Sequence, residues 1–338
     1  MHFRRSKIAR LLEGSVCNAD QGRLRLPAGD GRDWYDRKCA LSRGCFKSRQ
    51  KATSPCQVAD MPQMRQISDR NIRLRLRGQV MRALVTGAGK RLGRAMAVYL
   101  AEQGFDVAVH FATSAEEAAQ TCAEIRAMGR KAVMLQADLL DEIQVQDLVP
   151  RAALALGGAV TVLVNNASIF EYDNIHSATR TNWDRHMESN LRAPFVLIQA
   201  LAAQCLPSET DALGEPVASG LVVNMIDQRV WKPTPEFMTY SLAKAALWAL
   251  TQTAAQGLAP QIRVNAIGPG PTLQGSRQSD THFARQRAAT LLQRGANPSD
   301  VTAALGFFLN SPSVTGQMIA TDGGQHLAWE TPDVLGVE

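Results

Sequence analysis

Hydrophobic positions alternate between two periods from residue 81 onward. Short apolar runs such as M-R-A-L-V-T at 81–86 predict buried strands, and the amphipathic stretches between them predict helices. The predicted strands lie at 81–86, 106–111, 131–136, 160–165, 220–225, 262–267 and 317–320. The predicted helices lie near 91–103, 114–127, 141–156, 182–205, 237–258 and 299–309. Because β-α-β crossovers are right-handed, this order predicts one α/β domain, a Rossmann-type doubly wound parallel sheet of about seven strands flanked by helices.

Two stretches of this region have no clear period. Residues 207–218, which read P-S-E-T-D-A-L-G-E-P-V-A, predict a surface loop between a helix and a strand. Residues 271–298 form the longest stretch of this kind. A long loop in a compact domain is often a lid, so we expect this segment to cover a site.

Residues 1–80 lack the alternating pattern. They show no sustained period, and they hold 18 Lys and Arg against 7 Asp and Glu. We expect residues 1–80 to be a basic, disordered extension and 81–338 to be the folded domain. Because Met81 opens the first strand, the hypothesis is that a residue near Met81 is the functional start and that a translation-start error created the extension. Few aromatic residues accompany the basic ones, so no nucleic-acid partner is expected.

Charge and cysteine content narrow the function class of residues 81–338. This part holds 19 basic against 24 acidic residues, so the net charge of +6 of the whole chain stems from the extension. No C-x-x-C pair or His partner at ligand spacing is present, and no metal site is expected. No apolar run approaches the roughly 18 residues of a membrane span. We expect a protein of the reducing cytoplasm without a membrane partner.

A glycine-rich turn follows the first predicted strand. It reads T-G-A-G-K-R-L-G from Thr86 to Gly93, and it leads directly into a predicted helix. Glycines let backbone N–H groups and the helix N-terminus approach a pyrophosphate. The spacing differs from G-x-G-x-x-G, and Arg91 occupies a position where another glycine is common. The turn predicts a dinucleotide site.

A tyrosine and a lysine lie one helical turn apart at Tyr240 and Lys244. An ammonium at this distance stabilises a phenolate and lowers the pKa of the phenol from about 10. Tyr240 could then exchange a proton during catalysis. Such a pair alone is weak evidence, because tyrosines and lysines fall four residues apart by chance in many surface helices.

Further polar residues stand at strand ends and within an apolar helix. N-N-A-S at 165–168 ends the fourth predicted strand, Asn190 lies in the long apolar helix, and G-P-G at 268–270 ends the sixth strand. Together with the glycine turn and the Tyr240–Lys244 pair, these motifs resemble the short-chain dehydrogenase/reductase family. A core asparagine bonded to the backbone remains the alternative for Asn190.

The resemblance implies roles for residues across 81–328. Tyr240 would exchange the proton, Lys244 would bind the ribose hydroxyls and lower the pKa of Tyr240, and Asn190 would anchor a proton-relay water. The implied cofactor contacts are Gly87, Arg91, Leu92, Gly93, Ser114, Asp138, Leu139, Asn166, Ala167, Ser168, Tyr240, Lys244, Pro269, Gly270 and Thr272. Asp138 could instead cap the following helix. The family also implies a homo-oligomer, a dimer or tetramer, with helices 182–205 and 237–258 as contact surfaces.

The end of the second predicted strand favours NADPH over NADH. An acid there would bond the ribose 2′-hydroxyl of NADH and repel a 2′-phosphate, but the strand ends H-F-A-T-S with no acid. Arg91 supplies a planar cation, and Ser114 supplies a hydroxyl. Ser114 could equally be a helix N-cap, and Arg91 a surface charge. The family branch described next often has an arginine at Thr113, so the preference for NADPH could be weaker here.

The residue thirteen positions before the tyrosine departs from the usual family pattern. Most members have a serine there that orients a substrate carbonyl, whereas this chain has Asp227. A carboxylate could bond the amino and ring N–H groups of a heterocycle, but an ionised one cannot donate to a ketone oxygen. The aspartate, T-G-A-G-K-R-L-G-R and N-N-A-S-x-F resemble the pteridine reductase branch. In that branch the residue at Phe170 stacks on the pterin, although a core phenylalanine beneath the lid is the alternative.

The sequence therefore predicts an NADPH-dependent reductase that transfers a hydride to a C=N bond of a pterin or dihydropterin. The resemblance assigns the substrate contacts to Ser168, Phe170, Asp227 and Tyr240. One alternative is a carbonyl reductase of the same family acting on a 3-oxoacyl thioester or another ketone. An alternative of another class is a non-catalytic NADP-binding redox sensor, which would not need Tyr240, Lys244 and Asn190 together.

Overall fold

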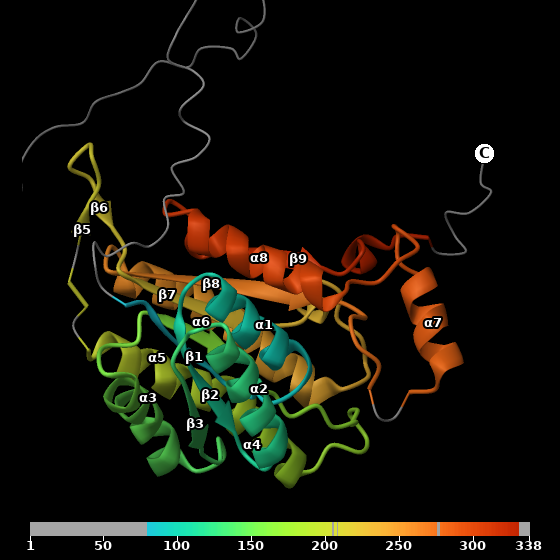
Figure 1. The fold of residues 1–338 in the computed structure, drawn as a ribbon. Coiled ribbons are helices and arrows are strands. Elements are labelled where there is room, and N and C mark those ends of the chain that lie inside the picture. Colours follow the sequence, from blue (N-terminus) through green and yellow to red (C-terminus); the bar gives the residue numbers. More distant parts are fainter. Residues whose placement is uncertain (1–79, 205, 208, 276–277, 331–338) are drawn as a thin grey trace, which may run out of the picture. The chain divides into compact units, whose positions relative to one another are not determined.

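The computed structural model describes residues 80–204, 206–207, 209–275 and 278–330. Its centre is a parallel sheet of seven strands in the order β3-β2-β1-β4-β7-β8-β9 (Figure 1). The strands are β1 (Arg82–Val85), β2 (Asp106–Phe111), β3 (Ala132–Gln136), β4 (Val162–Asn165), β7 (Gly220–Met225), β8 (Ile262–Pro269) and β9 (Met318–Thr321). The predicted doubly wound sheet and its seven strands are confirmed.

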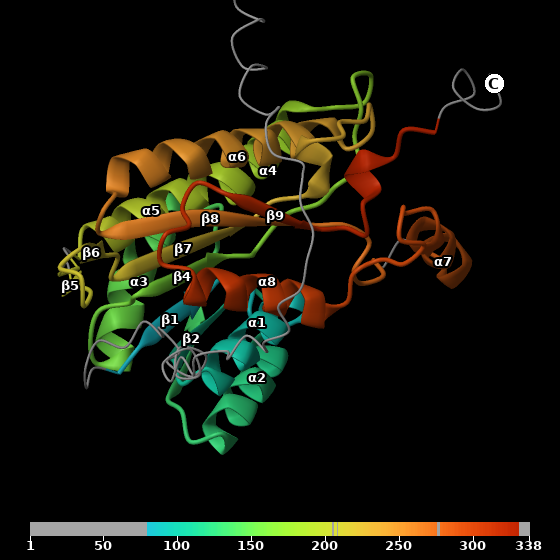
Figure 2. The ribbon, with the colours of Figure 1, turned by 90° about the horizontal axis from the view of Figure 1, so that it is seen from above.

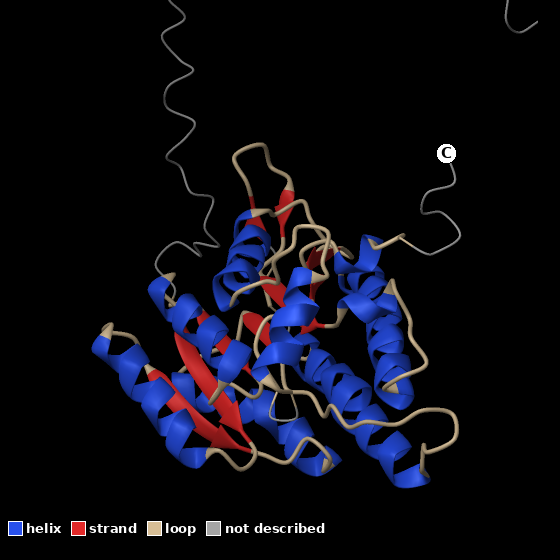
Figure 3. Cartoon of the chain, turned by 90° about the vertical axis from the view of Figure 1, so that its right-hand side faces the viewer, coloured by secondary structure: helices blue, strands red, loops and turns tan. Residues whose placement is uncertain are grey.

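Helices cover both faces of the sheet (Figure 2). The helices are α1 (Arg91–Glu102), α2 (Ala115–Ala127), α3 (Glu142–Leu156), α4 (Arg180–Met187), α5 (Ala193–Ala202), α6 (Met238–Leu258), α7 (Asp280–Ala288) and α8 (Pro298–Asn310). Helices α1, α2 and α8 share one hydrophobic core with the sheet, and α3, α5 and α6 share the other. Helices also enclose the strands when the domain is viewed from the side (Figure 3). Because side chains of both strand faces are buried, the central strands read as continuous apolar runs rather than as alternations.

The order in which strands are added to the sheet changes direction at β1, which lies between β2 and β4. Strands β1, β2 and β3 extend toward one edge, and β4, β7, β8 and β9 extend toward the other. All seven strands are parallel, so their carboxyl ends, and the loops that follow them, lie on the same side of the domain. Doubly wound sheets bind ligands in the crevice at such a reversal.

Three local predictions need correction. The segment 271–298 is not a continuous loop, because it contains α7, in which no side chain is buried. A helix that is polar all round has no hydrophobic period, so its sequence could not reveal it. The predicted loop at 207–218 contains a short hairpin of β5 (Glu209–Thr210) and β6 (Pro216–Val217). The predicted helix at 182–205 begins at Arg180 and is interrupted by a π-helical turn over Glu188–Arg192.

The predicted basic extension, residues 1–80, lies outside the described residues except for Val80. None of the helices in the described ranges is long and apolar enough to cross a membrane.

Candidate active site

A cavity of about 1280 Å³ lies where the carboxyl ends of β4, β7 and β8 meet the glycine turn after β1. Its lining comes from six segments of the sequence: the glycine turn, the stretch after β4, the stretch after β7, the start of α6, the stretch from β8 into α7, and Gln325 after β9. The predicted site residues that line it are Arg91, Leu92, Asn166, Ser168, Phe170, Asp227, Tyr240, Lys244, Pro269, Gly270 and Thr272. Gly87, Gly93, Ser114, Asp138, Leu139, Ala167 and Asn190 lie outside this lining.

The glycine turn is held in a shape that only glycine permits at two positions. Gly87 has a φ of +62°, and a Cβ on Gly93 would lie 2.1 Å from the carbonyl oxygen of Gly87. The side chain of Asn166 donates to the carbonyl oxygens of Thr86 (2.8 Å) and Gly87 (3.3 Å). Asn166 and Ala167 also donate their N–H groups to the Thr86 hydroxyl. The N-N-A motif at the end of β4 therefore holds the turn in place through these hydrogen bonds.

The N-terminus of α1 faces the cavity with its first amides uncapped. Within the described residues, no side chain caps this helix at Lys90, and its first turn carries no acidic residue. Unpaired N–H groups and the helix dipole together favour an anion. The turn and the helix start thus fit the pyrophosphate of a dinucleotide.

His110 of β2 braces the glycine turn from the other side. Its Nδ1 accepts the N–H of Gly87 at 3.0 Å, and its Nε2 lies 3.1 Å from the carbonyl oxygen of Ala137. Only a neutral imidazole protonated on Nε2 satisfies both contacts. Burial is the main cause that lowers the pKa of His110 to about 4. Sequence reasoning missed this residue, and its one signal was a histidine among the apolar residues of a predicted strand.

The low pKa of His110 predicts a loss of stability in acid. Because the folded protein holds the imidazole neutral, its stabilising effect is complete above the unfolded pKa of about 6.5 and is lost as the pH falls toward 4. The loss should be on the order of 3 kcal/mol at pH 4. Urea unfolding of the wild type and of His110→Gln from pH 7 to pH 4 measures it, since a glutamine side chain at position 110 does not titrate in this range. If the free energy of unfolding depends on pH equally in the two proteins, the role of His110 is refuted.

Arg91 belongs to the glycine turn, and Ser114 lies beside it. Arg91 adopts a φ of +53°, a region that glycine occupies at no steric cost, which explains why glycine is common there. Its guanidinium donates to the carbonyl oxygens of Leu273 (2.9 Å) and Gln274 (2.6 Å) in the segment after β8. Ser114 stands at the N-cap position of α2 without a side-chain cap bond within the described residues. Its Oγ is so close to the turn that a Cβ on Gly89 would lie 3.0 Å from it.

Asp138 and Leu139 lie in the turn after β3. The Asp138 carboxylate accepts the N–H of Leu140 at 3.0 Å, and Leu139 is buried in the core beside α3. The cap of α3 is Asp141, which accepts the N–H groups of Ile143 and Gln144. The alternative interpretation of Asp138 as the cap of the following helix is therefore wrong.

Tyr240 and Asp227 form a direct hydrogen bond. The Tyr240 hydroxyl donates to Oδ2 of Asp227 at 3.0 Å, and the other oxygen of Asp227 accepts the N–H of Arg229 at 2.9 Å. Burial, followed by the charge of Asp227, raises the pKa of Tyr240 well above its usual value. Burial also raises the pKa of Asp227. The direction at Tyr240 is opposite to the one expected from Lys244 alone, so the site holds a proton on the phenol.

Lys244 lies one turn after Tyr240 in α6, and only 2% of its surface is exposed. Its Nζ donates to the carbonyl oxygen of Met225 at 2.7 Å and lies 5.7 Å from the centroid of the Tyr240 ring. Burial lowers the pKa of Lys244 to about 8, and the charge of Asp227 opposes this shift. The predicted pair thus shares one face of α6, as its spacing required.

Asn190 lies in the π-helical turn between α4 and α5. Its amide donates to the carbonyl oxygen of Ile169 at 2.8 Å, and its Oδ1 accepts the N–H of the same residue at 2.9 Å. A π-helical turn is rare and often marks a functional site. Asn190 in this structure therefore anchors the backbone just before Phe170.

The aromatic end of the cavity combines Phe170, which was predicted from the sequence, with Phe237 and Arg229, which were not. The ring of Phe170 is 42% exposed and stacks on Phe237 with centroids 4.3 Å apart. It also packs edge-to-face with the ring of Tyr240, with the two ring centroids 4.7 Å apart. The Arg229 guanidinium lies 5.0 Å from the Phe237 centroid and 5.9 Å from that of Phe170. Phe170 is thus a cavity residue and not a core phenylalanine, and Phe237 and Arg229 extend its surface.

In the described ranges, no group of three His, Cys, Asp or Glu side chains could hold a metal ion. The site offers hydrogen-bonding groups, a flat apolar surface and an anion-binding helix terminus. It can therefore bind a dinucleotide beside a flat polar molecule and hand a proton to the latter.

The model of the short chain dehydrogenase family matches residues 81–284 of the chain. Among individual proteins, 3-oxoacyl-[acyl-carrier-protein] reductase FabG of Staphylococcus epidermidis is 30% identical over 250 residues. The match covers 72% of this chain and 98% of that protein. Tyr240 and Lys244 lie within the matched region of the family.

Two crystal structures with NADP are also similar. FolM alternative dihydrofolate reductase 1 of Brucella suis is 44% identical, with a TM-score of 0.69, and the match covers 75% of this chain and 98% of that one. A short chain dehydrogenase of Burkholderia cenocepacia is 33% identical, with a TM-score of 0.65 and coverage of 73% and 98%.

Proposed function

This chain belongs to the short-chain dehydrogenase family, and from that premise we propose that it is an NADPH-dependent reductase acting on a C=N bond of a pterin or dihydropterin. The coarser activity, an NADP-dependent oxidoreductase, follows from the family and from the related structures that contain NADP. The 44% identity to a dihydrofolate reductase exceeds the 30% identity to an oxoacyl reductase, and this difference supports a pterin-like substrate.

The observation that carries the proposal is the carboxylate of Asp227 beside the Tyr240 hydroxyl, at 3.0 Å. A carboxylate accepts hydrogen bonds, so it suits the amino and ring N–H groups of a pterin. A ketone oxygen needs donors, and Asp227 would remove one of the two that the family usually provides. The stretch after β7 therefore favours a nitrogen heterocycle over a ketone.

The cofactor preference is supported by the cations and hydroxyls beside the glycine turn. NADPH, when bound, supplies the hydride. Gly87, Gly93 and the first amides of α1 would hold the pyrophosphate, and Arg91 and Ser114 would serve the 2′-phosphate. Arg91 would have to leave its contacts with Leu273 and Gln274 to do so.

The path of the proton follows from the pKa values of the buried residues. Tyr240 keeps its proton until a substrate nitrogen needs it, because burial and Asp227 disfavour the phenolate. Lys244, with a pKa near 8, is largely charged at neutral pH, so it would bind the ribose hydroxyls and stabilise the phenolate once it forms. The Phe170 ring offers a flat apolar surface on which a pterin would stack.

One assay tests the proposal. NADPH absorbance is followed with the full chain and 7,8-dihydrobiopterin, dihydroneopterin or acetoacetyl-CoA. We expect turnover with at least one dihydropterin and slower turnover with the thioester. Turnover of the thioester alone would assign the carbonyl reductase function instead. NADPH binding without turnover of any substrate would favour the redox sensor.

We also propose that the protein forms a homo-oligomer through α4, α5 and α6. Trp183, Phe195 and Leu242 on these helices are each more than one third exposed, although they are large and apolar. The two cysteines within residues 81–338 suit a reducing cytoplasm, where we place the reaction.

A further inference from the structure

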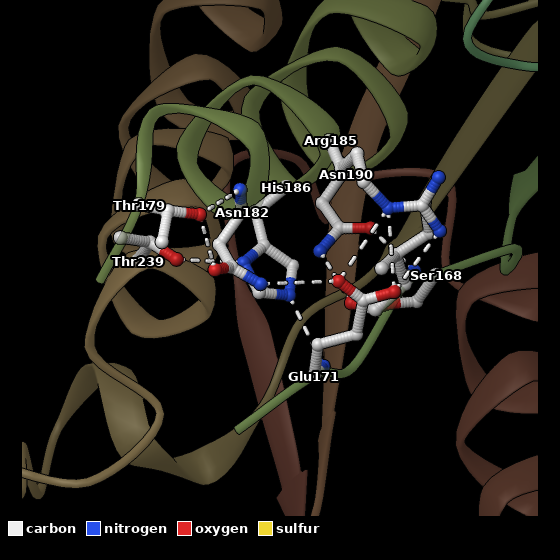
Figure 4. Close-up of polar contacts among 9 residues, drawn as sticks. Ser168, Glu171, Thr179, Asn182, Arg185, His186, Asn190 and Thr239 are labelled. Carbon is white, nitrogen blue, oxygen red and sulfur yellow. Dashed lines mark hydrogen bonds and ion pairs between the residues drawn. The ribbon is translucent and has the colours of Figure 1, made fainter. Parts of the chain in front are cut away.

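His186 of α4 is a completely buried residue between the two segments that carry Phe170 and Tyr240 (Figure 4). One segment, 169–173, follows β4, and the other is the start of α6. His186 does not line the cavity, and no step of the proposed reaction uses it. A fully buried imidazole needs a partner for each nitrogen, so its contacts reveal what it holds together.

The hydrogen bonds of His186 form a chain with a defined direction. The N–H of Glu171 donates to Nε2 at 3.1 Å, and Nδ1 lies 2.7 Å from the Thr239 hydroxyl. That hydroxyl donates to Oδ2 of Asp173, so it must accept from Nδ1. The Thr239 N–H donates to Oδ1 of Asp173 at 3.1 Å. Only a neutral His186 protonated on Nδ1 satisfies every member.

Both neighbours of Phe170 are held by hydrogen bonds, one of them by His186. Ile169, before Phe170, is held by Asn190 through two hydrogen bonds. Glu171, after Phe170, is held by His186 through its N–H. His186 of α4 and Asn190 of the π-helical turn that follows it therefore fix the backbone on each side of the exposed Phe170 ring.

The same chain of bonds acts on the start of α6. Thr239 immediately precedes Tyr240, and the N–H of Phe237 donates to the carbonyl oxygen of Asp173 at 2.8 Å. Phe237 adopts a φ of +56°, a conformation that a bulky residue keeps only when its surroundings impose it. Through Thr239 and Asp173, His186 is thus linked to the residue that bears the reactive hydroxyl.

We propose that His186 is a positioning residue: with Thr239 and Asp173 it sets the distance between the Phe170 ring, on which the substrate stacks, and the Tyr240 hydroxyl. The inference rests on the proposed function of Phe170 and Tyr240. The two rings are 4.7 Å apart at 72°, so a small shift of either segment alters the space for a flat substrate. A misplacement of about 1 Å can cost on the order of 10²-fold in rate.

Charged and titratable groups surround His186 on three sides. Asp173 and Glu171 come from the segment after β4, Arg185 precedes it in α4 and pairs with Glu171 at 3.0 Å, and the Tyr240 ring of α6 lies 6.1 Å away. Burial is the main cause that lowers the pKa of His186. A protonated ring would have two donors and no acceptor, so Glu171 would lose its partner.

The test compares His186→Phe, which keeps a ring but no nitrogen, with His186→Gln, which keeps a donor and an acceptor. The exposed His176→Phe is the matched control. We expect His186→Phe to lower kcat for the dihydropterin about 10- to 100-fold with an unchanged Kd for NADPH, and His186→Gln to stay within about 3-fold of the wild type. The wild type should lose kcat in acid, at a pH below the ordinary pKa of histidine because burial lowers the pKa of His186, and His186→Gln should not show this loss. A kcat of His186→Phe within about 2-fold of the control would overturn the proposal.

Two further measurements keep the test decisive. If His186→Phe does not fold, Thr239→Val replaces it with Thr239→Ser as the control, since the serine keeps the hydroxyl, and a loss of kcat confined to the valine variant supports the proposal. If the wild type turns over no dihydropterin, the proposed function fails, and amide hydrogen exchange at Glu171 and Thr239 decides. Exchange at least about 10-fold faster in His186→Phe than in His176→Phe supports the positioning role, and unchanged exchange overturns it.

Discussion

Replacing Tyr240 with phenylalanine is expected to reduce turnover about 10³-fold and to leave the Kd for NADPH within about 3-fold of the wild type. The variant loses the hydroxyl, which is the proton donor of the proposed reaction, and general acids contribute about 10² to 10⁴ to a rate. It keeps the ring that packs against Phe170 and His186. Steady-state kinetics with a dihydropterin and fluorescence titration of NADPH measure the two effects separately.

Tyr99→Phe is the matched control for this variant. Tyr99 lies in α1 outside the cavity lining, so loss of its hydroxyl should leave kcat unchanged. Near-normal kcat for Tyr240→Phe would refute the proton-donor role. A large rise in the Kd for NADPH with unchanged kcat would instead assign Tyr240 to cofactor binding alone.

Replacing Asp227 with serine is expected to lower kcat/KM for the dihydropterin about 10²- to 10³-fold and to lower that for a ketone much less. Asp227 caps the short turn at Gln228–Val230 by accepting the N–H of Arg229. Serine is also a good cap, so the local fold should persist while the carboxylate is lost. A serine hydroxyl can donate to a ketone oxygen, and it leaves the amino group of a pterin without a charged acceptor.

Asp227→Asn separates the charge of the side chain from its shape. The amide keeps one acceptor oxygen beside Tyr240, but it carries no charge, so the pKa of Tyr240 should fall relative to the wild type because the charge of Asp227 raises it. Competition between a dihydropterin and acetoacetyl-CoA measures the change in selectivity for both variants. Equal losses of kcat/KM for the two substrates would contradict a substrate-selecting role.

The hydrophobic pattern predicted the parallel sheet closely. The strands at 106–111 and 220–225 were predicted with the observed bounds, because their side chains are buried on both faces and their sequences are mostly apolar. The family was also predicted from short motifs, and the match over residues 81–284 confirms it. The roles of the individual site residues stay predictions. The structure supports their placement in that most of the predicted residues, Asp227, Tyr240 and Lys244 among them, line one cavity.

What the sequence determined by itself was the set of local features: the strands, the glycine turn, the spacing of Tyr240 and Lys244, and the unusual Asp227. Each depends on residues that are near one another in the sequence, at most thirteen positions apart. Only the tertiary structure decided that the pKa of Tyr240 rises rather than falls, because burial and Asp227 act across segments. It likewise brought Phe237 into the cavity lining and placed His186 against the segments that carry Phe170 and Tyr240. Packing between distant segments leaves no period in the sequence, so contacts of this kind are visible only in the folded chain.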